Sequence, residues 1–469
     1  MKRIISLILC ATIIFGASVC VNADFSAKKY SQEEWDALYD SLKDGNNLPT
    51  LNVGSDETSV SLCWHAKTEF AKAEVRVAKS NDMADAKIFT GIETPAMNDG
   101  ESVCRVVIDG LEENTTYYYQ WYIGEEGWSD TKEYSTKSFG DHKALVIGDI
   151  QVCEDWRTDS PNQSEIGFNW INVLAVALQN NPDISYLVTP GDNTSTGATE
   201  KEWQTLLMPE ALRGLPMAMA IGNHDKKGFT YNYFTNMPNE YYGRFFAGLD
   251  RDFWFRYGDV LYMVYDSTSG NAPDHMAFTK EAVELNKDAK WRIGVVHHGI
   301  YGAGDAIGDI ETELLMTAIF TPIFESYDFD FVITGHTHSQ GRSHFMENGK
   351  VVQKAESGST VNNPKGIVYL NANSVCEKVI IDFEAEHLAY GFHENDYTAY
   401  STLEFKGNSL IVETRRGDNN ELMDSLTITK DIEFEEDSAA NVLKRVGYKV
   451  IEALGLVYTL IDNLVRKFQ

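Results

Sequence analysis

The spacing of hydrophobic and polar residues divides the chain into two large regions with different predicted structures. Between Leu48 and Phe139, short apolar runs such as "TSVSLCWHA" and "SVCRVVIDGL" are separated by turn residues, without helical periodicity between them. Strands at this spacing are typical of a β-sandwich. Beyond Lys143, short apolar runs such as "KALVIGD" alternate with longer segments whose apolar residues recur at helical spacing, as in "SEIGFNWINVLAVALQNN". This alternation predicts βαβ units and a largely parallel sheet core.

The patterns predict a multidomain chain. An all-β sandwich is expected over residues 48–139, followed over residues 140–430 by an α/β domain with hairpins at "FWFRYGDVLYMVYD" and "SHFMENGKVVQKAE". Ahead of both, Ser31 and Glu34 have the spacing of a capping box, which predicts a polar helix within residues 24–47.

The two ends of the chain predict export and a terminal helix. Lys2 and Arg3 precede an apolar stretch and then small residues, which indicates a signal peptide over residues 1–23 and a secreted or extracytoplasmic protein. An uncleaved anchor is less favoured because the apolar stretch is short for a membrane span. Residues 431–469 combine an acidic linker with an amphipathic helix. Docking of this helix on the protein's own surface is favoured, and weak contact with the cell envelope is the alternative.

The charge of the chain and its cysteines limit the binding partners and disulfide bonds that we expect. With 40 Lys and Arg against 70 Asp and Glu, the chain should repel nucleic acid, so we expect no nucleic-acid partner. A highly charged anionic substrate would need metal ions to neutralise it. Four cysteines lie outside the predicted signal peptide: Cys63, Cys104, Cys153 and Cys376. Cys63 and Cys104 are the favoured disulfide pair because they fall in one domain, with buried free thiols as the alternative.

Metal-binding residue types follow five predicted strands of the α/β region. They are Asp149, Asp192, Asn223 with His224, His297 with His298, and His336 with His338. The carboxyl ends of strands in an open α/β sheet meet at one crevice, so these residues should converge. Glycines at 148, 191, 222 and 335 would let the backbone turn sharply and point the ligands inward. Mixed Asp, Asn and His ligands suit a pair of divalent transition-metal ions, namely Zn, Mn, Fe or Co.

The order of these motifs (GD, GD, GNHD, HH, GHTH) resembles the signature of the metallophosphoesterase, or calcineurin-like phosphoesterase, superfamily. The preceding strands, with "IDGLEENTTYYYQW", are similar to the fibronectin type III-like domain of its purple acid phosphatase branch. "GHTHSQGRS" and the closing strands after Tyr400 also look like that branch. The resemblance covers residues 48–430 and implies an αββα fold for the second domain.

The resemblance also implies roles for individual residues. The first ion would be held by Asp149, Asp192 and His338, and the second by Asp192, Asn223, His297 and His336. Asp192 would bridge the two ions, and a metal-bound hydroxide would attack phosphorus. His224 would contact the phosphate and stabilise charge or protonate the leaving oxygen.

Several neighbouring residues have two interpretations. His297 is favoured over His298 as the ligand, because Gly299 then stands where the family has a turn residue; His298 would contact substrate or orient a ligand. Asp225 would orient a neighbouring histidine or contact substrate. Arg342 would either clamp phosphate or pair with an acidic neighbour.

Two positions depart from the resemblance. Ser195 stands where the purple branch has a tyrosine, three residues after the bridging aspartate. Gln151 stands where many metallophosphoesterases have a histidine ligand, and it offers only a weaker neutral oxygen. The first metal site therefore has fewer strong ligands than in the family.

Together these features predict an exported binuclear metal-dependent phosphoesterase acting on small phosphate esters, most simply as a phosphomonoesterase. The alternatives are a phosphodiesterase or nucleotidase, and a non-catalytic surface binding protein with a structural metal site. Aromatic residues of the segment after Asp225 could stack on a nucleobase, but packing is favoured; they are Phe229, Tyr231, Tyr233 and Phe234. In the first domain we expect no ligand cluster, and His65 is expected to pack as a lone histidine.

Overall fold

The computed structural model describes residues 28–42, 48–152, 163–228, 230–243, 251–302, 310–375, 385–391 and 398–431. The predicted signal peptide, the C-terminal linker and helix, Phe229, Cys153 and Cys376 lie outside these ranges. Among the helices in the described ranges, none has the length and apolar character needed to cross a membrane.

The N-terminal region consists of two facing sheets, which confirms the predicted all-β domain. One sheet contains β1 (Thr50–Val53), β2 (Val60–Lys67), β6 (Glu101–Ile108) and β5 (Ile92–Pro95). The other contains β4 (Lys87–Thr90), β3 (Glu74–Ala78), β7 (Thr116–Gly124), β8 (Gly127–Trp128) and β9 (Lys132–Ser135). Side chains from both sheets, including Leu62, Trp64, Val75 and Tyr119, form one buried core between them. This core removes enough apolar surface from water to hold the sheets together.

The first of these sheets continues without interruption into the α/β domain. Within the described ranges it has 11 strands in the order β21-β26-β25-β24-β10-β11-β12-β1-β2-β6-β5. The added strands are β10 (His142–Val146), β11 (Ile184–Thr189), β12 (Met217–Met219), β21 (Ser359–Asn362), β24 (Ala399–Lys406), β25 (Ser409–Arg416) and β26 (Leu422–Thr429). The junction is a parallel contact in which Asn52 of β1 faces Met217 of β12. The Asn52 amide donates to the Met217 carbonyl over 3.1 Å, and its oxygen accepts from the Asn236 N–H over 2.9 Å. The two domains therefore share backbone pairing as well as side-chain contacts.

A second, eight-stranded sheet packs against the first. Its order is β13-β14-β15-β16-β17-β22-β18-β23. The strands are β13 (Tyr241–Tyr242), β14 (Arg251–Tyr257), β15 (Val260–Tyr265), β16 (Trp291–Val296), β17 (Phe331–Thr334), β22 (Val368–Asn371), β18 (Gly341–Ser343) and β23 (Leu388–Gly391). A separate hairpin joins β19 (Phe345–Glu347) to β20 (Lys350–Gln353), and it turns at Asn348 and Gly349, both with positive φ, as predicted.

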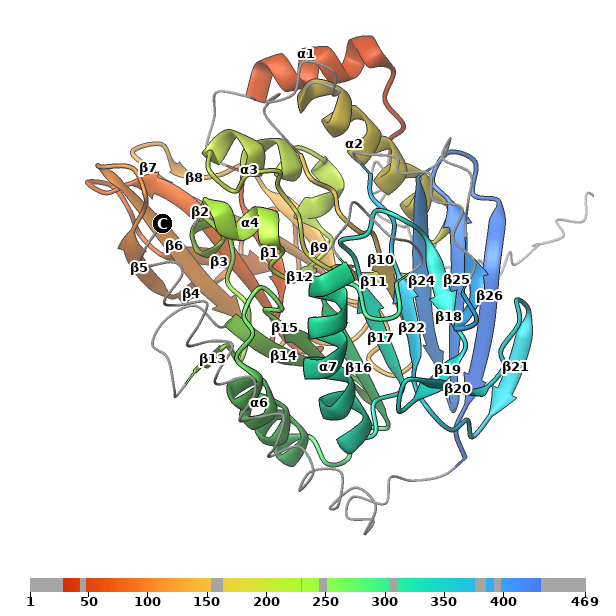
Figure 1. Ribbon diagram of the computed structural model, residues 1–469. Helices are drawn as coiled ribbons and strands as arrows, with labels where there is room; N and C mark the ends of the chain where they lie inside the picture. The colour runs from red at the N-terminus through yellow and green to blue at the C-terminus, as the bar shows by residue number, and fades with distance from the viewer. Residues whose placement is uncertain are drawn as a thin grey trace, which may run out of the picture.

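Helices cover the outer faces of the two sheets, which gives the predicted αββα layering (Figure 1). The helices of this domain are α2 (Gln163–Asn180), α3 (Glu200–Leu207), the 3₁₀ helix η1 (Glu210–Arg213), α4 (Asn223–Lys227), α5 (Tyr231–Phe234), α6 (Ala272–Leu285) and α7 (Ile310–Ser326). Strand β15 is apolar throughout because both of its faces are buried. Val260, Tyr262 and Val264 belong to the core between the sheets, whereas Leu261, Met263 and Tyr265 pack with α6 and α7.

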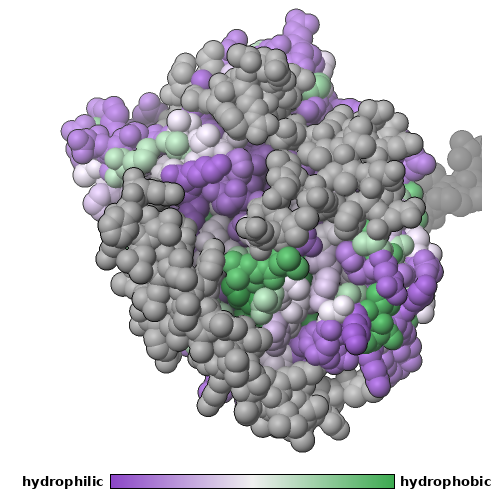
Figure 2. Space-filling view, in the orientation of Figure 1, coloured by the Kyte–Doolittle hydropathy of each residue, from purple (hydrophilic) through white to green (hydrophobic). Residues whose placement is uncertain are grey.

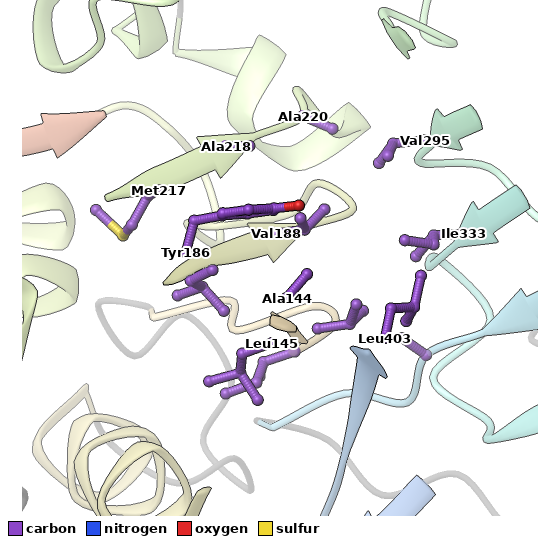
Figure 3. Close-up of a cluster of buried hydrophobic side chains, with 14 of the residues drawn as sticks. Ala144, Leu145, Tyr186, Val188, Met217, Ala218, Ala220, Val295, Ile333 and Leu403 are labelled. Atoms are coloured by element: carbon purple, nitrogen blue, oxygen red, sulfur yellow. The ribbon is translucent and has the colours of Figure 1, made fainter. Parts of the chain in front are cut away.

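The core between the sheets lies directly beneath the predicted site. Figure 3 shows side chains of β10, β11 and β12 gathered with Val295 of β16 and Ile333 of β17. Within each sheet the strands that precede the site motifs are parallel: β10 with β11 and β12, and β15 with β16 and β17. The parallel strands are thus divided between two mixed sheets, and their carboxyl ends meet at one rim.

The predicted N-terminal helix is confirmed as α1 (Gln32–Leu42). Its capping box is formed: the Ser31 N–H donates to the Glu34 carboxylate over 3.0 Å, and the Glu34 N–H donates to the Ser31 hydroxyl over 3.3 Å. Trp35 is fully buried against α2, where a Cβ on Gly167 would lie only 2.3 Å from its ring. The absence of a side chain at Gly167 therefore lets α1 dock.

The favoured disulfide between Cys63 and Cys104 is wrong, and both are buried free thiols. On adjacent strands β2 and β6, Cys63 faces Arg105 and Trp64 faces Cys104, so the two sulfurs lie on opposite faces of the sheet. Cys104 belongs to the sandwich core, whereas the Cys63 sulfur contacts the Tyr233 carbonyl of the α/β domain. Burial raises the pKa of both thiols to about 12, which keeps them protonated and unreactive.

Candidate metal centre

The carboxylate of Asp192 lies at the centre of the predicted site. Asp192 follows β11, is 1% exposed, and accepts the His224 backbone N–H over 2.8 Å. Its other oxygen lies 3.3 Å from Nε2 of His297 and accepts the Gln151 amide over 3.2 Å. Asp192 is therefore fixed from three sides by residues that follow three different strands.

Two groups of potential metal ligands share this carboxylate. The first is Asp149, Asp192 and His338, and the second is Asp192, His297 and His336; within each group, one ligand atom per residue lies within 4.8 Å of the others. A shared carboxylate between two sets of imidazole and carboxylate ligands is the arrangement of a bridged metal pair. The donor types fit divalent transition-metal ions.

In the second group, an amide oxygen and two imidazole nitrogens lie close together. Nδ1 of His297 donates to the Pro190 carbonyl over 3.0 Å, which turns Nε2 toward the centre. There, Oδ1 of Asn223 lies 2.8 Å from this Nε2 and 3.1 Å from Nδ1 of His336. When deprotonated, these two nitrogens and the amide oxygen are ligand atoms suited to one transition-metal ion. Asn223 therefore lies beside both His297 and His336 and belongs with them as a potential ligand.

In the first group, Asp149 is completely buried after β10. Both of its oxygens accept the His336 backbone N–H over 3.0 Å, and one lies 3.7 Å from Nε2 of His338. The Ser374 hydroxyl donates to the Asp149 carbonyl over 2.9 Å and holds the loop. Asp149 and His338 therefore converge with Asp192 as the first group.

The electrostatics of the centre reflect two buried carboxylates close together. Burial, together with Asp192, raises the pKa of Asp149 well above its usual value. Burial also opposes ionisation of Asp192, but His297 and His224 outweigh it and lower the Asp192 pKa. Burial lowers the pKa of His297, yet Asp192 and Asp149 outweigh it and raise the value to about 9. A positive charge close to the two carboxylates is therefore stabilising. Metal ions would supply that charge in competition with a proton on His297.

The backbone is strained at the ligands themselves. Positive φ angles occur at Asp149 (33°), Asp192 (48°), His336 (69°) and His338 (54°). Each such conformation costs about 1–3 kcal/mol for a residue other than glycine and concentrates at functional sites. The four glycines beside the ligands were predicted to allow sharp turns of the backbone. Of these four, only Gly191 has positive φ.

The other three glycines are required by close approach. A Cβ on residue 222 would lie 2.1 Å from Oδ1 of Asp192, and a Cβ on residue 335 would lie 2.5 Å from Oδ2 of Asp149. A Cβ on residue 148 would lie 2.7 Å from the Asn373 carbonyl. These glycines leave room for the carboxylates and loops of the centre.

Comparison with known families agrees with this geometry. The model of the calcineurin-like phosphoesterase family matches residues 142–340, and that of the purple acid phosphatase N-terminal domain matches residues 47–136. The chain carries a calcineurin-like phosphoesterase domain. With the N-terminal domain before it, this match reproduces the domain order that the sequence predicted.

Individual relatives support the same architecture. The chain is 27% identical over 261 residues to purple acid phosphatase 1 of Ipomoea batatas, a match that covers 51% of this chain and 52% of that protein. The chain thus spans about half the length of that curated relative. A purple acid phosphatase from yellow lupin (Lupinus luteus) seeds is similar in fold, with a TM-score of 0.66, 15% identity, and coverage of 82% of this chain and 75% of that one. PhoD gives a TM-score of 0.54 at 11% identity, covering 87% and 98% of the two chains. At these identities the two structures show the fold alone.

His224 of the phosphoesterase domain lies beside the metal ligands. It sits in the first turn of the short helix α4, and its side chain is 21% exposed. Nδ1 donates to the Ser195 carbonyl over 2.5 Å, and Nε2 lies 4.0 Å from Asp192. On the face in Figure 2, hydrophilic surface gathers around α4, whereas hydrophobic surface lies over α7, where Leu314 is 65% exposed. A polar substrate can therefore reach His224 from solvent.

Ser267 is a residue of the phosphoesterase domain that sequence reasoning missed. Its hydroxyl oxygen accepts the backbone N–H groups of His297 and His298, each over 3.1 Å, and its O–H lies 2.9 Å from Nδ1 of His298. Burial, then His336 and His297, lowers the pKa of His298 well below its usual value, so its ring is neutral. The only sequence signal was a polar pair, Asp266 and Ser267, directly after an apolar strand.

The carboxylate of Asp225 braces two loops of the phosphoesterase domain. Its carboxylate is completely buried and accepts from the Asn193 N–H and amide, the Thr194 N–H and hydroxyl, and the Gly222 N–H, all at 2.8–3.1 Å. These bonds join the loop after β11 to the start of α4. Asp225 therefore fixes Asp192 and His224 relative to each other.

Of the two interpretations of Arg342, the structure shows the ion pair. Its guanidinium donates to both oxygens of Asp424, over 2.6 and 3.0 Å, and both side chains are buried. Its remaining terminal nitrogen donates to the Ser343 and Ala355 carbonyls. Arg342 therefore pairs with Asp424 of β26, and the structure favours this ion pair over a phosphate clamp.

Replacing Arg342 with methionine should lower the free energy of unfolding by about 3–5 kcal/mol, because Asp424 would remain buried without its partner. Urea unfolding of the folded protein measures this. The double variant Arg342→Met/Asp424→Leu should recover most of the loss. An increased KM with unchanged stability would instead indicate a phosphate clamp.

Proposed function

We propose that the chain hydrolyses small phosphate esters at a pair of divalent metal ions. The observation that carries the proposal is the position of Asp192, whose single carboxylate belongs to both ligand groups. A pair sharing one carboxylate has the ~3.5–4 Å spacing that suits displacement at phosphorus.

The proposed ligands follow from the geometry. One ion would be held by Asp149, Asp192 and His338, and the other by Asp192, Asn223, His297 and His336. When bound, the ions would neutralise phosphate charge and activate water as a nucleophile. In a chain with a net charge of −30, such local positive charge is what an anionic ester needs.

The chain's own residues would orient the ester and move a proton. Because Nδ1 of His224 donates to the Ser195 carbonyl, Nε2 is the atom left for substrate, and in the imidazolium form it donates to a phosphate oxygen or the leaving oxygen. Ser267 constrains His298 in a similar way through Nδ1, and the ring of His298 lies 4.7 Å from that of His336 between centroids. Both rings are therefore held at one nitrogen.

A phosphomonoester is the favoured substrate class. Of the aromatic residues considered for nucleobase stacking, Tyr231 is buried with its hydroxyl engaged on the Met219 carbonyl. Phe234 is buried and stacks on Trp203 at 5.1 Å between ring centroids. These two residues support the packing interpretation, which favours monoesters over nucleotides. Export of the chain, supported by its first 23 residues, remains part of this proposal.

A substrate panel combined with metal analysis tests the function. Chelated protein should be inactive, and Zn or Mn should restore turnover of aryl and alkyl phosphomonoesters above that of diesters and nucleotides. Two bound ions without turnover of any ester would instead indicate the non-catalytic binding protein.

The iron-loaded protein should be colourless, and a divalent ion alone should restore activity. The colour of purple acid phosphatases comes from a tyrosinate bound to ferric iron, and at the matching position Ser195 offers no phenol; its carbonyl is engaged by His224. With fewer anionic ligands the first site should favour divalent ions. Visible absorption spectra measure this, and an intense band that disappears on mutation of a tyrosine would contradict it.

A further inference from the structure

A second cluster of potential metal ligands lies between the two domains. His65 of β2, Glu101 of β6 and Glu200, the first residue of α3, each place one ligand atom within 4.8 Å of the others. His65 does pack, since its ring stacks on Phe234 at 4.5 Å between centroids. However, the expectation that residues 48–139 contribute no ligand cluster is wrong, because two of these three residues belong to that range.

The ring of His65 is oriented as a metal ligand would be. Nε2 lies 2.9 Å from the Tyr233 carbonyl, which can only accept, so Nε2 carries the proton. Nδ1 then faces the two carboxylates, 3.8 Å from Glu101 and 3.7 Å from Glu200. His297 in the main centre has the same arrangement, with one nitrogen on the Pro190 carbonyl and the other toward the ligands. A backbone carbonyl behind the ring is the usual support of a metal-binding histidine.

The distances from Nδ1 of His65 to the two carboxylates are close to those between ligands of one metal ion. Ordinary hydrogen bonds to nitrogen span ~2.7–3.2 Å. Ligands held ~2.0–2.2 Å from a tetrahedral zinc ion lie roughly 3.3–3.6 Å from one another. In the main centre, His297 lies 3.3 Å from Asp192 and His338 lies 3.7 Å from Asp149. The 3.7 and 3.8 Å separations at His65 fall close to this spacing.

One imidazole and two carboxylates face one another at the boundary between the domains. The His65 side chain is 4% exposed, and those of Glu101 and Glu200 are 30% and 17% exposed. Two carboxylates held this close repel each other when both are ionised, and a divalent cation between them relieves that repulsion. The guanidinium of Arg105 donates to the Thr235 carbonyl, the Thr94 hydroxyl and the Asn232 carbonyl.

We propose that His65, Glu101 and Glu200 bind a divalent transition-metal ion, with Zn²⁺ as the best match, and that this ion joins the two domains. One imidazole and two carboxylates suit Zn²⁺, with water completing the coordination. The ion would fix the start of α3, where Thr199 caps the helix, directly after the loop that carries Ser195. This site is independent of the proposed phosphoesterase chemistry.

Zinc content and anomalous diffraction test the proposal on the full chain. Zinc-loaded wild type should bind about one ion more than Glu200→Gln or His65→Gln, and crystals should show an anomalous peak beside Nδ1 of His65. Zinc should also raise the thermal unfolding midpoint of the wild type more than that of Glu200→Gln. The control is Glu210→Gln, because Glu210 pairs with Lys132 across the same domain boundary at 2.8 Å, outside the cluster. It should keep the additional ion.

Equal zinc content in all four proteins, with no peak at His65, would overturn the proposal and identify the cluster as an ion pair. Because Glu200→Gln keeps the shape of the side chain, it remains informative if His65→Gln fails to fold. Peaks at the main centre report separately on the proposed phosphoesterase site, so failure of one assignment does not imply failure of the other.

Discussion

Replacing Asp192 with alanine should abolish phosphoester hydrolysis and remove both metal ions together. Its carboxylate is the one group shared by both ligand sets, and it also anchors the His224 N–H and the Gln151 amide. The loss should exceed the roughly 10- to 100-fold cost of removing a group that only orients a ligand. Metal analysis after dialysis and turnover of an aryl phosphate measure the two effects.

A matched control uses the opposite end of the same strand. Asp183 precedes β11, pairs with Lys143 and is 58% exposed, so Asp183→Ala should retain both metals and activity. If Asp192→Ala kept two tightly bound ions, the bridging assignment would be wrong, and another carboxylate would have to connect the two groups.

Replacing His224 with alanine should lower kcat by roughly 10²–10⁴ while the metal content persists. The imidazole is held by the Ser195 carbonyl and lies 4.0 Å from Asp192, so its loss removes a proton donor or charge stabiliser. The backbone N–H of residue 224, which supports Asp192, is retained in the alanine variant. The bridge should therefore remain intact.

The control for this variant is His387→Ala. His387 contacts the Gly302 carbonyl over 3.1 Å and contributes to neither ligand group, so kcat should be unchanged. Loss of metal together with activity in His224→Ala would show that His224 is itself a ligand and would reverse the division of roles.

The sequence was most informative where strands end. The strands β10, β11, β16 and β17 each end in a buried, largely apolar run, and a polar residue after that run cannot continue into the core. This constraint acts on neighbouring residues, so the alternation of elements and the positions of Asp149, Asp192, His297 and His336 could be read directly. Their convergence followed from the general geometry of parallel strands.

Contacts between segments that are far apart in the sequence could not be predicted from the local pattern. The Arg342 partner, Asp424, lies 82 residues away, and Glu200 reaches His65 from a different domain. The shared sheet depends on one parallel contact between Asn52 and Met217. Nothing in the local pattern of either segment specifies its partner, because many surfaces would satisfy the same hydrophobicity.

The sequence by itself determined which elements form and which side chains stand at their ends, because hydrophobic spacing and turn residues act over a few neighbours. Only the tertiary structure decided what those side chains do. It placed Cys63 and Cys104 on opposite faces of a sheet, and it turned Asp225 into a brace between two loops. The physical reason is that hydrogen bonds, ion pairs and metal coordination depend on ångström-scale distances, which are set by the packing of the two sheets and their helices.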